Sequence, residues 1–155
     1  MKLKNPMLVV RDIDQSVEFY NRVFGLHVIM DFGANKTLTG GLALQTAETY
    51  QEFIGDRAIS FGGNSFELYF EEDDFDGFIA KLGQRNDIQY IGDGVKEAGW
   101  GQRTVRFYDL DGHIIEVGEN MKMVVKRFIH SGMSMEETSR RMDVSVSDLE
   151  KLLQS

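Results

Sequence analysis

Four side chains with oxygen acceptors fall in the middle of predicted β-strands, where they could take part in chemistry. Two are the amides Asn5 and Gln45, and two are the carboxylates Glu67 and Glu116. Successive residues of a strand point to opposite faces of its sheet, and each of the four lies on the half-polar face. Such groups could hydrogen-bond to one another in a wet crevice, or they could hold a positively charged group.

A second set of side chains shares these polar faces or the loops beside them. Arg106 and Tyr108 lie on one face of a predicted strand and could grip an anionic part of a substrate. Arg106 could equally pair with an acid such as Glu67 or Glu116. Tyr69 lies on the same half-polar face as Glu67, and we include it among the candidate substrate-binding residues.

Trp100 is the only tryptophan and stands between two glycines in a predicted loop. Its indole could stack on a ligand as a lid, because glycine-flanked loops move and binding residues are often found on loops. The alternative is that it plugs the end of the sheet. The sequence leaves both interpretations open.

An internal repeat supplies the elements that position these residues. Apolar residues recur at helical spacing from Ile13 and again from Phe75, 62 residues later. The same offset carries 26–29 onto 88–91 and Asn5 onto Glu67. Each half therefore predicts the order strand–helix–strand–strand–strand, which makes the fold class α+β.

Alternation along the strands also predicts which side chains form the core. One face of each strand is apolar and should pack against the two helices. The residues assigned to this face are Leu8, Val10, Leu42, Leu44, Phe66, Leu68, Phe70, Val105, Phe107, Ile115 and Val117.

Composition excludes several classes of protein. The 155 residues contain no cysteine, which excludes a disulfide framework, a thiolate zinc site and a cysteine nucleophile. Seventeen basic residues against 25 acidic ones give a net charge of −8, the opposite of the sign usual for nucleic-acid binding. The longest apolar run near the start is 7–10, too short for a signal peptide or a membrane span. We expect a cytoplasmic protein with no membrane partner.

Three segments resemble the vicinal oxygen chelate superfamily, which groups glyoxalase I, bleomycin-resistance proteins and extradiol dioxygenases. They are LVVRDIDQSVEFYNRVFGL (8–26), FELYFEEDDFDGFIAKL (66–82) and GWGQRTVRFYDLDGHIIEVGEN (99–120). The resemblance covers about residues 1–120. It implies two βαβββ modules that curl a mixed sheet around a cleft, and it implies a homodimer. It is specific for fold rather than activity, because one fold hosts many chemistries.

The resemblance also implies a ligand set, since metal-dependent members use four strand positions. These fall on Asn5, Gln45, Glu67 and Glu116, of which only Glu116 keeps the family residue. Four oxygen donors would suit Mg²⁺ or Mn²⁺ better than Ni²⁺ or Zn²⁺. A metal there could stabilise an enediolate, with Glu67 or Glu116 as the catalytic base. The alternative is a cleft without metal, because no imidazole remains at any of the four positions.

The three histidines do not restore an imidazole site. The extradiol dioxygenases need two histidines and a carboxylate on these strands. His27 begins a strand and His130 is in the tail. His113 follows the turn Asp111-Gly112, one place away from the parity of Glu116, and we expect a turn or sheet residue.

The last 35 residues have a different charge balance and helical patterning. Residues 1–120 carry a net charge of −9 and 121–155 a net charge of +1. The tail predicts three short helices that resemble a helix-turn-helix, with Ser134 and Glu137 as a capping box. The last predicted helix carries Asp148 and Glu150, which argues against DNA binding. We expect a domain over 1–120 and a helical extension over 121–155 that covers the sheet, braces a dimer or gates the cleft.

Three functions fit these observations. The first is a glyoxalase-like lyase or isomerase that uses a divalent metal, with Glu67 and Glu116 as catalytic residues. The second is a metal-free protein that sequesters a small molecule, such as a cationic drug or a metabolite. The third is a ligand sensor that acts through the tail. In each case Arg106, Tyr108, Trp100 and Tyr69 are the expected ligand contacts.

Overall fold

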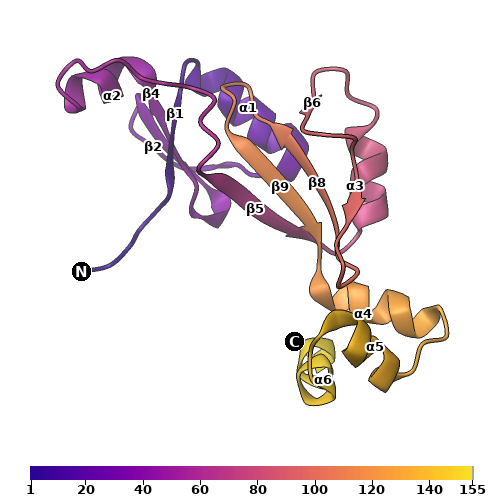
Figure 1. Cartoon of the computed structure of the whole chain (residues 1–155). Coiled ribbons are helices and arrows are strands. Elements are labelled where there is room, and N and C mark those ends of the chain that lie inside the picture. Colours follow the sequence, from indigo (N-terminus) through magenta and orange to yellow (C-terminus); the bar gives the residue numbers. More distant parts are fainter. Residues whose placement is uncertain (155) are drawn as a thin grey trace. The chain divides into compact units, whose positions relative to one another are not determined.

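The computed structural model describes residues 1–154 and divides the chain into two compact units (Figure 1). Unit 1 consists of Met1–Phe66 and the returning segment Tyr108–Ile114. Unit 2 consists of Glu67–Phe107 and the chain from Ile115 onward. Each unit contains one of the two predicted βαβββ modules and builds its own sheet.

Unit 1 is built on a four-stranded mixed sheet with the order β1-β4-β3-β2. β1 and β4 are parallel, with Val9 opposite Gln45, and the other two pairings are antiparallel. A short 3₁₀ turn over Thr39–Gly41 leads into β4. The elements are β1 (Met7–Val10), α1 (Ile13–Phe24), β2 (Val28–Asp31), β3 (Asn35–Leu38), β4 (Ala43–Thr46) and α2 (Ala47–Phe53).

Local sequence signals explain where α1 begins and ends. The Asp12 carboxylate accepts hydrogen bonds from the backbone N–H groups of Asp14 and Gln15, which caps the first turn. Gly25 ends the helix in the left-handed conformation, with φ of 70°. On the inner face Phe19 and Tyr20 are buried.

Unit 2 contains a five-stranded sheet with the order β5-β9-β8-β6, and β7 pairs with β8. β9 therefore lies between β5 and β8, so that the strands of the second half of the repeat form one sheet. This sheet and its C-terminal helices confirm the predicted α+β fold with paired modules. The elements are β5 (Glu67–Glu72), α3 (Phe75–Leu82), β6 (Gln89–Tyr90), β7 (Lys96–Glu97), β8 (Arg103–Tyr108), β9 (Ile114–Glu119), α4 (Met121–His130), α5 (Met135–Met142) and α6 (Val146–Gln154).

The predicted apolar faces form the core, with one clear exception. Val10, Leu44, Phe107 and Ile115 are fully buried. The prediction that Phe66 belongs to the buried face is wrong, since its side chain is 52% exposed. The physical reason is that β5 is the edge strand of its sheet and begins one residue later, so Phe66 lies outside the ladder.

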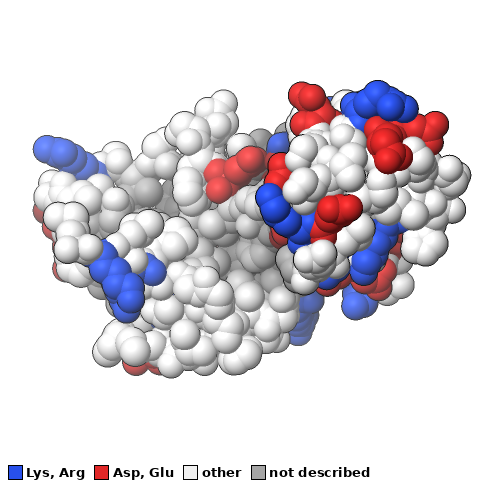
Figure 2. All heavy atoms as spheres, turned by 90° about the horizontal axis from the view of Figure 1, so that it is seen from below, with Lys and Arg blue, Asp and Glu red and all other residues white. Residues whose placement is uncertain are grey.

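The three C-terminal helices pack around a small apolar cluster within unit 2. Val124, Val125, Phe128, Met142 and Leu149 are its buried members. Ser134 and Glu137 form the predicted capping box at the start of α5. On the outside, acidic and basic side chains alternate over the lobe on the right of Figure 2 that these helices form. A domain boundary at residue 120 stays a prediction.

A buried carboxylate joins the first of these helices to the sheet of unit 2. Glu119 ends β9 and is 3% exposed. Arg103 of β8 donates to it from Nε at 3.0 Å, and Arg127 of α4 donates from Nη2 at 2.9 Å. Burial alone would raise the pKa of Glu119, but the hydrogen bonds and charges of these two arginines outweigh it and lower the pKa. The carboxylate is therefore held ionised between two cations.

No helix within residues 1–154 is both long enough and apolar enough to cross a bilayer.

Candidate functional site

Three of the predicted site residues meet on adjacent strands of unit 2. Glu67 lies on β5, Glu116 on β9 and Arg106 on β8. The Arg106 Nε donates to Glu67 Oε2 at 3.3 Å, and its Nη2 forms an ion pair with Glu116 Oε2. Glu116 is buried, whereas Glu67 and Arg106 are each 41% exposed. One guanidinium group thus bridges the two carboxylates, as the second alternative for Arg106 expected.

This bridge decides how well the residues fit a divalent metal. A guanidinium is always charged at physiological pH and already occupies the cation position between the two carboxylates. A metal ion at these oxygens would face both the loss of those ion pairs and repulsion from Arg106. Among residues 1–154, moreover, three or more His, Asp or Glu side chains nowhere gather in a way that could hold a metal. The side chains present do not fit the metal that the resemblance implies.

The two predicted amides belong to unit 1 and serve its local structure. Asn5 donates from Nδ2 to the carbonyl oxygen of Gly41 at 2.6 Å. Gln45 is 5% exposed; its Oε1 accepts from Asn35 at 2.9 Å, and its Nε2 donates to Thr49. The bond from Asn35 thus uses Gln45 Oε1, the atom with which Gln45 would bind a metal, and the bond to Gly41 ties the Asn5 side chain to the turn before β4. Asn5 and Gln45 therefore act within unit 1, and Glu67 and Glu116 within unit 2.

The other predicted contacts divide between the units in the same way. Tyr69 accepts a hydrogen bond from Gln102 Nε2 at 2.9 Å and donates to Glu71 at 3.2 Å. Trp100 is 49% exposed, and its indole N–H lies 3.4 Å from Gln102 Oε1. Tyr108 is partly buried and belongs to unit 1, at the point where the chain returns to it. A role for these three in ligand binding stays a prediction.

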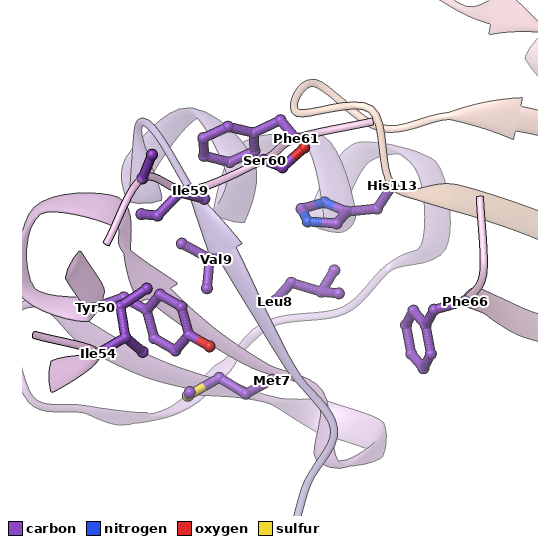
Figure 3. Close-up of a pocket in the computed structure, with 11 residues that line it drawn as sticks. Met7, Leu8, Val9, Tyr50, Ile54, Ile59, Ser60, Phe61, Phe66 and His113 are labelled. Atoms are coloured by element: carbon purple, nitrogen blue, oxygen red, sulfur yellow. The ribbon is translucent and has the colours of Figure 1, made fainter. Parts of the chain in front are cut away.

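Unit 1 contains a pocket that the sequence patterns did not reveal. Its volume is about 430 Å³, within the range of roughly 300–1,000 Å³ typical of small-molecule sites. Figure 3 shows Leu8 and Val9 of β1 in the middle of the lining, with Tyr50 of α2 on one side and His113 on the other. The full lining is Met7, Leu8, Val9, Tyr50, Ile54, Ala58, Ile59, Ser60, Phe61, Phe66 and His113.

Residues 58–61 line one side of this pocket, and contacts with Arg11 and with the returning segment hold them in place. The Arg11 guanidinium lies 3.8 Å from the centre of the Phe61 ring, a cation–π contact. The same Arg11 donates from Nη1 to Asp111 at 2.9 Å. Gly112 packs so closely that a Cβ there would lie 3.2 Å from the Cα of Gly62. Phe61 is thus positioned over the pocket by contacts within unit 1.

A buried aspartate orients the histidine of the pocket. The Nδ1 of His113 lies 2.7 Å from Asp109 Oδ2, and the same oxygen accepts the hydroxyl of buried Tyr20 at 2.8 Å. The other oxygen accepts the backbone N–H groups of Asp111 and His113. Burial would raise the pKa of Asp109, but the hydrogen bonds that it accepts from His113 and Tyr20 lower it overall. The aspartate therefore stays ionised and fixes the imidazole.

His113, Tyr50 and Ser60 are the functional candidates that sequence reasoning missed. The sequence predicts that His113 is a turn or sheet residue. Its position, one residue out of the alternation of Glu116, assigns it to the face of the strand opposite the four candidate ligands. The available signal was the pair Asp109 and His113, four residues apart around a glycine turn. For Ser60 the sequence offers no signal, because the segment 55–66 has no periodicity.

The comparisons agree with this architecture. Residues 3–122 match the family model described as a glyoxalase-like domain. A crystal structure of a protein of unknown function from Agrobacterium tumefaciens is 36% identical, with a TM-score of 0.68 over 77% of this chain and 94% of that one. No curated protein is significantly similar to this chain.

Two further crystal structures show the same fold at lower identity. A glyoxalase/bleomycin resistance protein/dioxygenase family enzyme from Burkholderia phytofirmans is 18% identical, covering 75% of this chain and 96% of its own, with a TM-score of 0.65. A glyoxalase-related enzyme from Fulvimarina pelagi is 21% identical, covering 77% and 88%, with a TM-score of 0.66.

Proposed function

We propose, from the premise that this chain belongs to the glyoxalase-like domain family of the vicinal oxygen chelate superfamily, that it binds a small, largely apolar molecule without a metal ion. The single observation that carries this proposal is the pocket of about 430 Å³ in unit 1. Apolar and aromatic walls with a few polar groups are the usual composition of a ligand site. Here Tyr50, Ser60 and His113 supply those polar groups.

The charge of the lining supports a neutral ligand. None of the eleven residues around the pocket is Asp, Glu, Lys or Arg. A cationic drug would leave water for a site with no carboxylate to replace its hydration, which is costly. A neutral aromatic or aliphatic molecule gains from burial in the same site. We therefore place a neutral metabolite or drug in this pocket ahead of a cationic one.

A metal-dependent lyase or isomerase of the glyoxalase I type is the other function that the family offers. That function would require Arg106 to release Glu67 and Glu116, so that both carboxylates could become metal ligands or bases. Nothing in unit 2 replaces the cation that the buried Glu116 would lose, since Arg106 is the partner of its Oε2 among the described residues. The bridge supports the metal-free function. The homodimer and the cytoplasmic location stay predictions.

The pocket can be tested with anisole, a small aromatic probe without a hydroxyl group. At about 0.5 kcal/mol per heavy atom, its eight heavy atoms give a dissociation constant of roughly 1 mM. We expect a titration followed by ¹H–¹⁵N NMR to shift the amide signals of Leu8, Val9 and Ile59. The variant Val9→Trp, which places an indole in the middle of the pocket, should weaken anisole binding at least about tenfold.

The matched control is Val95→Trp, the same substitution at a residue of unit 2 that is 43% exposed. This variant should bind anisole as the unaltered protein does. Equal binding by Val9→Trp and the unaltered chain would contradict the assignment of the pocket, as would anisole shifts confined to unit 2.

A further inference from the structure

The imidazole of His113 presents one ring nitrogen to the pocket and the other to Asp109. Figure 3 shows the ring extending from the returning segment toward Leu8, Val9 and Ser60. Its Nδ1 is engaged by Asp109 at 2.7 Å. None of the described residues forms a hydrogen bond with Nε2. The nitrogen that faces the ligand space is therefore Nε2.

The state of Asp109 decides which ring nitrogen carries the proton. A carboxylate accepts hydrogen bonds and cannot donate one. Asp109 is ionised, because four hydrogen bonds converge on its two oxygens from Tyr20, Asp111 and His113. The neutral imidazole must then carry its proton on Nδ1, which leaves the lone pair on Nε2. His113 meets the pocket as a hydrogen-bond acceptor.

We propose that His113 Nε2 accepts a hydrogen bond from a hydroxyl group of the ligand, and that the ligand of this pocket is a neutral aromatic alcohol of the phenol class. This inference rests on the proposed function and specifies the chemistry of the same pocket. The aromatic part is matched by the rings of Tyr50, Phe61 and Phe66 in the lining. A carboxylate ligand fits less well, because the lining offers no cation and His113 offers no donor.

The contacts of Asp109 also distinguish this role from a purely structural one. The backbone N–H groups of Asp111 and His113 already hold the turn through Asp109 Oδ1. The side-chain contact from His113 goes to the other oxygen, Oδ2, which Tyr20 also uses. The turn thus has its own hydrogen bonds, and the additional contact fixes the orientation and the tautomer of the ring.

The first test reads the tautomer directly in the unaltered protein. Long-range ¹H–¹⁵N NMR separates protonated from unprotonated ring nitrogens, and the chain has only three histidines. The ring signals that are present in the unaltered protein and absent from the variant His113→Phe are those of His113. We expect Nδ1 to be protonated and Nε2 unprotonated at pH 8.5. A proton on Nε2 would overturn the inference whatever the variants do.

The second test compares phenol with anisole, which has the same ring and oxygen but no hydroxyl proton. We expect phenol to bind about five to ten times more tightly, the size of one net hydrogen bond. His113→Phe should bind both probes alike. The control His27→Phe makes the same substitution at an exposed histidine outside the pocket and should keep the preference for phenol.

The possible outcomes separate the two proposals. A preference for phenol that persists in His113→Phe, or that vanishes in His27→Phe, would overturn the role of His113 and leave the pocket as a binding site. Equal binding of phenol and anisole to the unaltered protein would do the same. Failure of both probes to bind would overturn the proposed function, and this inference with it.

Discussion

The variant Gly101→Ala should unfold with a free energy about 2–5 kcal/mol below that of the unaltered protein. Gly101 has a φ of +94°, which costs an L-residue about 1–2 kcal/mol. The new Cβ would also lie 2.1 Å from Cζ of Phe128, a buried member of the cluster beneath the C-terminal helices. Overpacking of this kind adds about 1–3 kcal/mol. Urea denaturation followed by circular dichroism measures the difference.

The control for this variant lies two residues away. Gly99 has a negative φ, and a Cβ there would have no atom within 4 Å. Gly99→Ala should therefore leave the free energy of unfolding unchanged or raise it slightly. Equal stability of Gly101→Ala and Gly99→Ala would show that Phe128 does not pack against Gly101. The packing of α4 against the loop before β8 would then be wrong.

Replacement of Glu119 by Gln should lower the free energy of unfolding by about 2–4 kcal/mol. The buried carboxylate joins Arg103 of the sheet to Arg127 of α4, and its loss leaves two cations without their shared partner. Breaking a fully buried pair costs about 3–5 kcal/mol; the effect is smaller here because both guanidinium groups are partly exposed. The control Asp76→Ala removes an 80% exposed partner of Arg103 and should cost about 0–1 kcal/mol.

The pH dependence of the free energy of unfolding tests the contribution of the ionised Glu119 carboxylate independently. Its pKa is lower in the folded protein than the value of 4.5 expected in the unfolded chain. A lowered carboxylate pKa stabilises the folded state above the unfolded pKa, and this contribution is lost as the pH falls through the folded pKa. The stability gap between the unaltered protein and Glu119→Gln should therefore narrow below about pH 4.5. A gap that stays constant down to pH 2 would contradict the ion-pair account.

The repeat made most of the fold predictable from the sequence. The 62-residue offset between the patterns that begin at Ile13 and Phe75 predicted a strand, a helix and a second strand in each half. Alternation after them predicted two further strands in each half, and β7 is the additional strand. Element ends were less predictable. The strand expected over 26–29 is β2 (Val28–Asp31), because the left-handed Gly25 turns the chain before the ladder begins.

The candidate site was predictable only in part, for two physical reasons. Alternation places Glu67, Glu116 and Arg106 on one polar face, but it cannot decide whether the arginine binds a substrate or the acids. The structure shows the ion pairs. The pocket of unit 1 depends on the segment 55–66, whose fold is set by Arg11 and by the returning turn. Such tertiary contacts leave no periodic signal.

Metal binding to chelator-treated protein tests the central claim most directly, because Arg106 takes the cation position between Glu67 and Glu116. We would titrate Mn²⁺, Mg²⁺, Ni²⁺ and Zn²⁺ by calorimetry, with the double variant Glu67→Gln/Glu116→Gln as the control. The account predicts no stoichiometric binding at micromolar concentration in the unaltered protein and no difference from the control. Stoichiometric micromolar binding that the double variant loses would contradict it and restore the metal-dependent enzyme.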